Sequence, residues 1–384
     1  HMHSEHEGVT RRDLNRVALI VAVLFAAMTS LLFMRLTPAM RMAGSSRWVT
    51  FVLVAVFIVA ALVCNSRCRR QIVWHNRVMA VWLVVAGACF SICAGATVST
   101  LLESGNPATV AVFCASGIAV ADMALMSVCV REPMVRGVVS AVSFVALPLA
   151  LASAATVLFD LSVQLLAGMV VAASVCGIQM MPNIVVHVPD RYLVEWRTYM
   201  TRRWTVRGSI PEEARVLTRK DVRQDMDSFL AQYSTGFTLC VVLSVLGYAA
   251  LAQWTDYHSL YDRIGFLVLS MLLMLFFELK PRQSGRPFER YVMRAAGIAI
   301  PLLWVGHATQ AIPEGEAMIP LICMVTFAAL GLVLGFSMVV QHNGFHSLAL
   351  SRIGDALCFI SMMLIPAASF LAGGALEFLR SMSW

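Results

Sequence analysis

The sequence predicts an all-α integral membrane protein with eleven transmembrane helices, its N-terminus in the cytoplasm and its C-terminus outside. Three observations predict it: the composition, the apolar runs and the distribution of basic residues. Of the 384 residues, 59% are hydrophobic and 13% are charged, and the mean hydropathy is +0.77. Little sequence therefore remains for a soluble domain. Because lipid offers no hydrogen-bond partners, long apolar runs must pair their backbone groups internally, as helices do.

Eleven apolar runs come close to the roughly 20 helical residues that span a hydrocarbon core about 30 Å thick. They lie near residues 17–34, 48–64, 78–97, 108–130, 137–159, 163–181, 235–254, 264–278, 291–312, 318–340 and 354–378. The sequence thus divides into a short cytoplasmic segment (1–16), helices one to six (17–181), a cytoplasmic helical linker (182–234) and helices seven to eleven (235–384).

The distribution of basic residues predicts the orientation, because cytoplasmic loops carry an excess of Lys and Arg. With eleven crossings and the N-terminus inside, fourteen basic residues fall in cytoplasmic loops and only five on the opposite side. The net charge of +7 has the same origin, so no nucleic-acid partner is expected. The fourteen are Arg11, Arg12, Arg16, Arg67, Arg69, Arg70, Arg77, Arg131, Arg136, Lys280, Arg282, Arg286, Arg290 and Arg352.

The linker contains a predicted amphipathic helix, with apolar side chains at helical spacing on one face and arginines on the other. Such a helix is suited to lie on the anionic cytoplasmic surface of the membrane. Packing against the protein's own helix ends and docking to a partner are the alternatives. The apolar face carries Leu193, Trp196, Met200 and Trp204, and the basic face carries Arg197, Arg202 and Arg203.

The end of the linker is predicted to join the seventh span as one long helix. Thr218-Arg-Lys-Asp221 has the spacing of a helix start, and the helical pattern then runs without a breaker to Gly236. Its first turns carry Arg219, Lys220 and Arg223, so this part is expected in the cytoplasm as a lever or docking post.

Sequence signatures of catalysis are missing: the sequence has no GxxxxGK[ST], HExxH or GxSxG motif. We expect no enzyme, no cofactor and no metal site, but bound lipids. A carboxylate at a helix centre costs about 2.5–3.5 kcal/mol on insertion scales, so Asp122 is expected to face the bundle interior or water, in a functional or a structural role. The other candidate intramembrane contacts are His307, Gln310 and Asp355.

Small residues mark candidate helix contacts. Gly331 and Gly335 form a GxxxG pattern in the tenth run, and Gly117 and Ala121 have the same spacing in the fourth. Small side chains let two helices approach closely. We expect these positions to lie in contacts within the subunit or between subunits.

Most of the ten cysteines lie inside apolar runs, where free cysteine packs as a small hydrophobe. Cys68 differs, because Arg67, Arg69 and Arg70 surround it in the sequence. Nearby positive charge favours the reactive thiolate. The sequence therefore predicts a surface thiol at Cys68, reactive or incidental.

This architecture resembles the EccD family, the polytopic inner-membrane subunit of the actinobacterial type VII (ESX) secretion machinery. That family has eleven helices with a long cytoplasmic segment between helices six and seven. It also shares a charged helix that runs into a span rich in small residues, comparable to Asp221–Gly247, and a basic stretch comparable to Leu279–Arg290. The resemblance covers nearly the whole chain.

The resemblance implies a non-enzymatic scaffold in the bacterial inner membrane. Such proteins form homodimers around a large lipid-lined vestibule and assemble with EccB, an EccC motor ATPase and EccE. The resemblance carries over no catalytic residue. Family members usually have a ubiquitin-like domain before the first helix, whereas residues 1–16 are too few to form one. Docking to EccC and EccE is therefore an open question.

The alternative is a secondary transporter of major-facilitator topology, which also has a cytoplasmic N-terminus, a long central loop and basic loops between helices two and three and helices eight and nine. Eleven runs instead of twelve argue against it. So do the few ionisable residues in the membrane and the segment Asn65–Arg77, which lacks the expected Gly and Asp pattern. The scaffold is the preferred interpretation.

Overall fold

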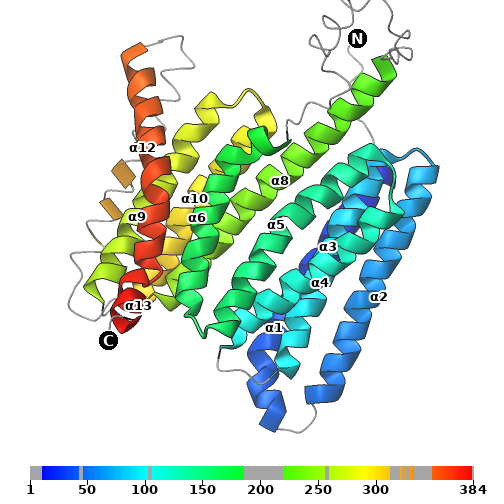
Figure 1. Cartoon of the computed structure of the whole chain (residues 1–384), viewed down its shortest axis with the longest axis horizontal. Coiled ribbons are helices and arrows are strands. Elements are labelled where there is room, and N and C mark those ends of the chain that lie inside the picture. Colours follow the sequence, from blue (N-terminus) through cyan, green and yellow to red (C-terminus); the bar gives the residue numbers. More distant parts are fainter. Residues whose placement is uncertain are drawn as a thin grey trace, which may run out of the picture.

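The computed structural model describes residues 11–42, 46–102, 106–185, 219–255, 259–311 and 348–382, together with short helical pieces between 321 and 332. Over these residues every regular element is helical (Figure 1). The α-helices are α1 (Arg11–Met42), α2 (Ser46–Val73), α3 (Arg77–Val98), α4 (Pro107–Cys129), α5 (Pro133–Leu158), α6 (Val163–Val185), α8 (Arg219–Trp254), α9 (Leu260–Leu279), α10 (Pro287–Ala311), α12 (Leu348–Ala372) and α13 (Ala375–Met382); the short 3₁₀ helices are η1 (Ser99–Leu101) and η3 (Lys280–Gln283).

The prediction of an all-α membrane fold is confirmed. Within the described residues, nine helices are long and apolar enough to cross a membrane. These nine belong to α1–α6, α8, α9 and α12. The ninth predicted run corresponds to α10, a helix of 25 residues that is not among the nine. The tenth run, 318–340, lies mostly outside the described residues. The count of eleven therefore stays a prediction.

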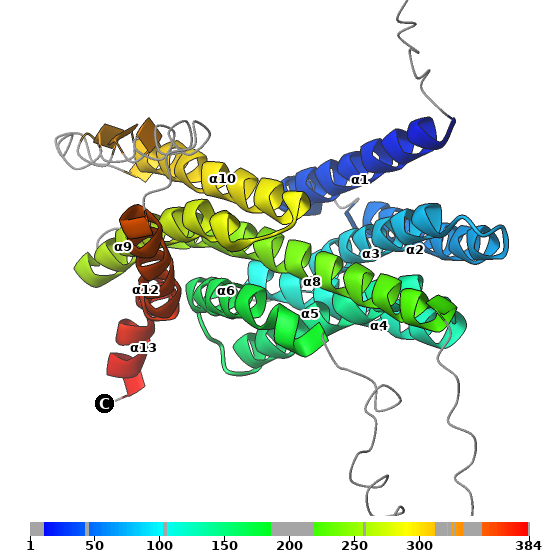
Figure 2. The ribbon, with the colours of Figure 1, turned by 90° about the horizontal axis from the view of Figure 1, so that it is seen from above.

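The helices form two packed groups. The first has α2 against α3, α3 against α4, and α4 against α5. The second has α6 against α8 and α12, with α9 and α10 completing it. Figure 2 shows α8 between α5 and α6 on one side and α10 on the other. Gly137 of α5 lies against the backbone of Ser228 in α8, so a small residue lets the two groups meet closely.

Helix α8 is longer than a membrane is thick. Its 36 residues from Arg219 to Trp254 span about 54 Å at 1.5 Å per residue, against about 30 Å for the hydrocarbon core. The end that begins at Arg219 extends past the neighbouring helices (Figure 1). The predicted continuous helix starting at Arg219 is confirmed.

The arginine-rich loops that connect the helices lie at one end of the bundle, where polar contacts join some of them. We call this end the basic end. Arg77 forms a 2.8 Å ion pair with Glu132, which joins the α2–α3 connection to the α4–α5 connection. Near the start of α12, the Gln283 side chain donates a 3.1 Å hydrogen bond to Asp355. The basic residues at this end are Arg67, Arg69, Arg70, Arg77, Arg131, Arg136, Lys280, Arg282, Arg286, Arg290 and Arg352.

The opposite end carries its own polar contacts. Asn106 before α4 donates a 3.2 Å hydrogen bond to Asp160 after α5. Gln164 of α6 donates to Asp262 of α9 at 3.0 Å and to the carbonyl of Ala372 in α12 at 2.7 Å. The loops thus alternate between two ends, as successive membrane crossings require.

The prediction of a surface thiol at Cys68 is wrong. Cys68 is 0% exposed and belongs to a buried core cluster formed mainly by α2, α3, α4 and α5. The second apolar run seemed to end at residue 64, but α2 continues to Val73. Cys64, Asn65 and Cys68 therefore share one buried helix face, while the arginines beside Cys68 point outward.

Candidate functional site

Asp122 lies at the centre of a polar cluster inside the first helix group. Asp122 is 8% exposed. The side-chain amide of Asn65 donates to Asp122 Oδ1 at 2.7 Å, and the Ser91 hydroxyl donates to Asp122 Oδ2 at 2.8 Å. The three residues come from α2, α3 and α4. A buried carboxylate is thereby satisfied by donors from two other helices, as its insertion cost requires.

The cluster can fix the rotation of three helices relative to one another. Each oxygen of the Asp122 carboxylate accepts a hydrogen bond from a different helix, so rotating any one helix would break a bond. Gly87 provides room, because a Cβ there would lie 2.7 Å from Asn65 Oδ1. Sequence reasoning missed Asn65 and Ser91. The signal that could have identified them is that a polar residue in one membrane helix usually hydrogen-bonds to polar residues in other membrane helices.

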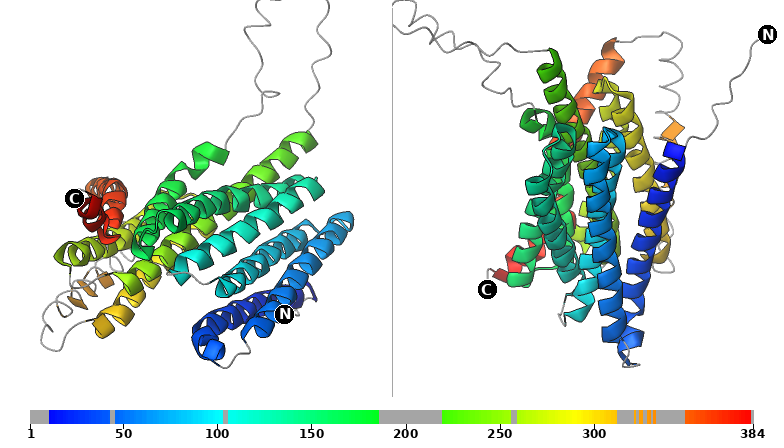
Figure 3. Two further views of the ribbon diagram at one scale, coloured as in Figure 1. Left: turned by 60° about the horizontal axis from the view of Figure 1, so that its bottom comes forward. Right: turned by 90° about the vertical axis from the view of Figure 1, so that its right-hand side faces the viewer.

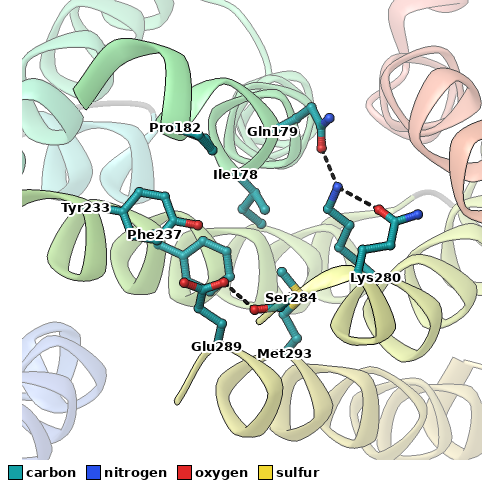
Figure 4. Close-up of a pocket in the computed structure, with 10 residues that line it drawn as sticks. Ile178, Gln179, Pro182, Tyr233, Phe237, Lys280, Ser284, Glu289 and Met293 are labelled. Carbon is teal, nitrogen blue, oxygen red and sulfur yellow. Dashed lines mark hydrogen bonds between the residues drawn. The ribbon is translucent and has the colours of Figure 1, made fainter. Parts of the chain in front are cut away.

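A cavity of about 270 Å³ lies at the basic end between α6, α8, η3 and α10 (Figure 4). Sequence reasoning did not identify it, because its residues come from three separate stretches of the chain. It is lined by Ile178, Gln179, Pro182, Tyr233, Phe237, Lys280, Gln283, Ser284, Glu289 and Met293.

One wall of the cavity carries a positively charged side chain, that of Lys280. Lys280 Nζ donates to the side-chain oxygen of Gln179 at 2.7 Å and to that of Gln283 at 3.2 Å. Both acceptors are neutral amides, so these bonds orient the ammonium group without neutralising it. Gln283 also connects this wall to the predicted residue Asp355.

The facing wall holds a carboxylate. Glu289, 8% exposed, accepts a hydrogen bond from the Ser284 hydroxyl, and the Tyr233 hydroxyl lies beside it. Arg286 lies 3.7 Å from the other carboxylate oxygen and stacks over the Tyr233 ring at 5.0 Å. The cavity therefore presents positive and negative charge on separate sides.

The structure does not bring the predicted site residues together. Asp122 lies in the first helix group and Asp355 in the second. No described atom comes within 4 Å of a Cβ built on Gly117 or Gly331, and Ala121 is exposed. These positions remain available to contacts between subunits, which stays a prediction.

The remaining predicted residues are only partly described. Arg219 and Lys220 form the first turn of α8, and Arg223 is exposed on it. His307 and Gln310 belong to α10, and their side chains lie outside the description. Gly335 and the amphipathic stretch from Leu193 to Trp204 lie outside the described residues. In the part of the chain that is described, no three His, Cys, Asp or Glu side chains gather as metal ligands would.

Comparisons with known proteins show a likeness in fold. No protein-family model matches the sequence, and no curated protein matches it. Among solved structures, a chain described as protomer 1 of the ESX-3 core complex matches over 97% of this chain and 78% of its own length, with a TM-score of 0.57 and 14% identity. The fold is that of an ESX-3 core-complex chain.

The likeness to a type VII secretion subunit stated from the sequence is thus confirmed in the fold. Hydropathy had predicted an all-α membrane protein, which agrees with this fold. At 14% identity the match shows which fold the helices adopt.

Proposed function

We propose that this chain is a non-enzymatic membrane subunit of a type VII protein secretion complex. The observation that carries the proposal is the fold match to the ESX-3 core-complex chain, which extends over 97% of the chain. The gathering of basic loops at one end adds support, because it gives a bacterial inner-membrane protein a cytoplasmic face. The two polar clusters, at Asp122 and Gln164, each join three helices, which suits a scaffold.

The same proposal includes eleven crossings with the N-terminus inside and the C-terminus outside. A helix, α10, lies at the position of the ninth run and has 25 residues, enough to cross by length, and helical residues between 321 and 332 fall within the tenth run. The basic end then faces the cytoplasm, together with the extended start of α8.

Reporter fusions test this orientation. Alkaline phosphatase is active only outside the cytoplasm, and green fluorescent protein fluoresces only within it. We expect fluorescence from a fusion at His75 and phosphatase activity from fusions at Phe159 and after Trp384. Fluorescence at the C-terminus would indicate an even number of crossings, contradict this topology and favour the transporter alternative.

We further propose that the subunit forms a homodimer around a lipid-lined vestibule and assembles with EccB, an EccC ATPase and EccE. Exposed apolar surface supports contacts of this kind. Helix α1 lies at the outer edge of the bundle (Figure 3), and Phe25 on it is 66% exposed. Lipid tails and apolar faces of other subunits are the surroundings that suit such side chains.

Gentle-detergent purification of the protein from its own membranes tests the secretion role. We expect a large complex that contains a motor ATPase, identified by native mass spectrometry of the co-purifying chains. A lone monomer of about the chain's 42.0 kDa would contradict the scaffold. Uptake assays in proteoliposomes would then test the transporter.

A further inference from the structure

The cavity at the basic end separates two opposite charges across an apolar floor. Lys280 reaches it from η3 and Glu289 from the first turn of α10. Figure 4 shows the two side chains on different sides of the cavity, with Ile178 and Met293 between them. A ligand that fills this space meets a positive group, an apolar surface and a negative group in turn.

The Lys280 side is suited to a phosphate. Its ammonium group is held by two amide oxygens, which fix its position but bring no negative charge. An anionic oxygen at this place would form a charge-assisted hydrogen bond, which is about twice as strong as a neutral one. Lysine binds phosphate in this manner, as a compact point charge.

The Glu289 side is suited to a primary ammonium group. Ser284 and Tyr233 orient the carboxylate. The nearby Arg286 is half exposed and 3.7 Å from it, so water screens that pairing. A carboxylate can accept several hydrogen bonds, and an –NH₃⁺ group can donate one, whereas a quaternary ammonium has no N–H to donate.

The position and size of the cavity restrict the occupant further. It lies where α6 and α9 end, at the level where apolar spans give way to the basic end. Its volume of about 270 Å³ is slightly below the range of about 300–1,000 Å³ that holds small molecules. It can accommodate a polar headgroup while acyl chains remain outside, along the apolar helix surfaces.

We propose that this cavity binds the headgroup of a phospholipid that carries both a phosphate and a primary amine. Lys280 contacts the phosphate and Glu289 the ammonium group. A soluble phosphate or phosphoethanolamine shares this chemistry, but the position of the cavity at the end of the spans favours the lipid. The proposal depends on the cavity itself and not on a role in secretion.

The wild-type headgroup preference is the first test. The delipidated full chain, with any partners that co-purify, is titrated in native mass spectrometry with phosphatidylethanolamine, phosphatidylglycerol and phosphatidylcholine of identical acyl chains. We expect phosphatidylethanolamine to bind about tenfold more tightly than the other two, the order expected for one charged hydrogen bond. Equal binding of the three lipids would overturn the proposal. Displacement of the lipid by millimolar inorganic phosphate or phosphoethanolamine would assign the cavity to a soluble ligand instead.

Two variants assign the contacts. Lys280→Gln should weaken both phosphatidylethanolamine and phosphatidylglycerol by about tenfold, whereas Glu289→Gln should weaken phosphatidylethanolamine alone. Lys280→Arg should retain binding because it keeps the positive charge. Arg223→Gln removes an exposed charge of α8 outside the cavity and serves as the matched control. Unchanged lipid binding in both cavity variants would refute the assignment, and the wild-type selectivity decides the outcome if either variant fails to fold.

Discussion

Gly95→Ala is expected to destabilise the protein strongly, because a single methyl group has no room between α3 and α4. A Cβ at Gly95 would lie 2.5 Å from the Cα of Ala115 and closer still to the carbonyl oxygen of Cys114. These are backbone atoms of the facing helix, so no side-chain rotation can relieve the overlap. Overpacking costs about 1–3 kcal/mol, and we expect the upper part of that range or more.

The measurement is thermal unfolding of the purified protein in detergent, with Gly117→Ala as the matched control. Gly117 lies in α4, and no described atom comes within 4 Å of a Cβ built there. Alanine is favoured over glycine in a helix by about 0.5–1 kcal/mol, so the control should be neutral or slightly stabilising. Equal melting temperatures for the two variants would show that α3 and α4 are not in this close contact.

The Gly117→Ala control has a second use in the intact complex. Gly117 and Ala121 were predicted as helix contacts. Among the described residues, no atom lies within 4 Å of a Cβ built on Gly117, and Ala121 is exposed. If Gly117→Ala leaves the isolated chain stable but reduces recovery of the dimer, the position lies between subunits. Unchanged dimer recovery would argue against that use of the small-residue face.

Asp122→Leu is expected to have the second largest effect. It removes the acceptor for Asn65 and Ser91 together, and an unsatisfied buried polar group costs about 1–3 kcal/mol. Asp122→Asn should behave nearly as the wild type. Its side chain keeps an oxygen for the Asn65 amide and gains an NH₂ group that can donate to the Ser91 hydroxyl.

Melting temperature, membrane level and secretion are the three readouts for these variants. The double variant Asn65→Leu/Asp122→Leu should recover part of the lost stability, because removing both partners of a buried hydrogen bond is less harmful than removing one. Loss of secretion or transport in Asp122→Asn, with normal membrane level and stability, would contradict a structural role. It would indicate that the ionisable carboxyl group is needed.

Segments whose structure follows from local free energies were predicted well from the sequence. The first six apolar runs each correspond to a helix, and α8 begins at Arg219 as its start signal predicts. Transfer of apolar residues into lipid is a property of each residue and its neighbours in the chain, so a hydropathy average captures it. Helix ends were less accurate. Helix α2 extends beyond its apolar run to Val73, because arginine side chains can reach the interface while the helix continues.

The contacts between helices required the tertiary structure. Hydropathy showed that Asp122 needs partners, but only packing decided that Asn65 and Ser91 supply them. Gly95 and Gly117 look alike in the sequence, yet among the described residues a facing backbone meets Gly95 and not Gly117. The cavity at the basic end depends on residues more than 100 positions apart, such as Gln179 and Lys280.

The physical reason is the difference between inserting a helix and orienting it. The sequence by itself determined the all-α membrane fold, the alternating loops and the long helix α8, because these depend on local hydrophobicity, charge and helix signals. Rotation and tilt of each helix are set by packing against its neighbours. The burial of Cys68, the Asp122 cluster and the opposed charges of Lys280 and Glu289 follow from that packing, which only the tertiary structure decided.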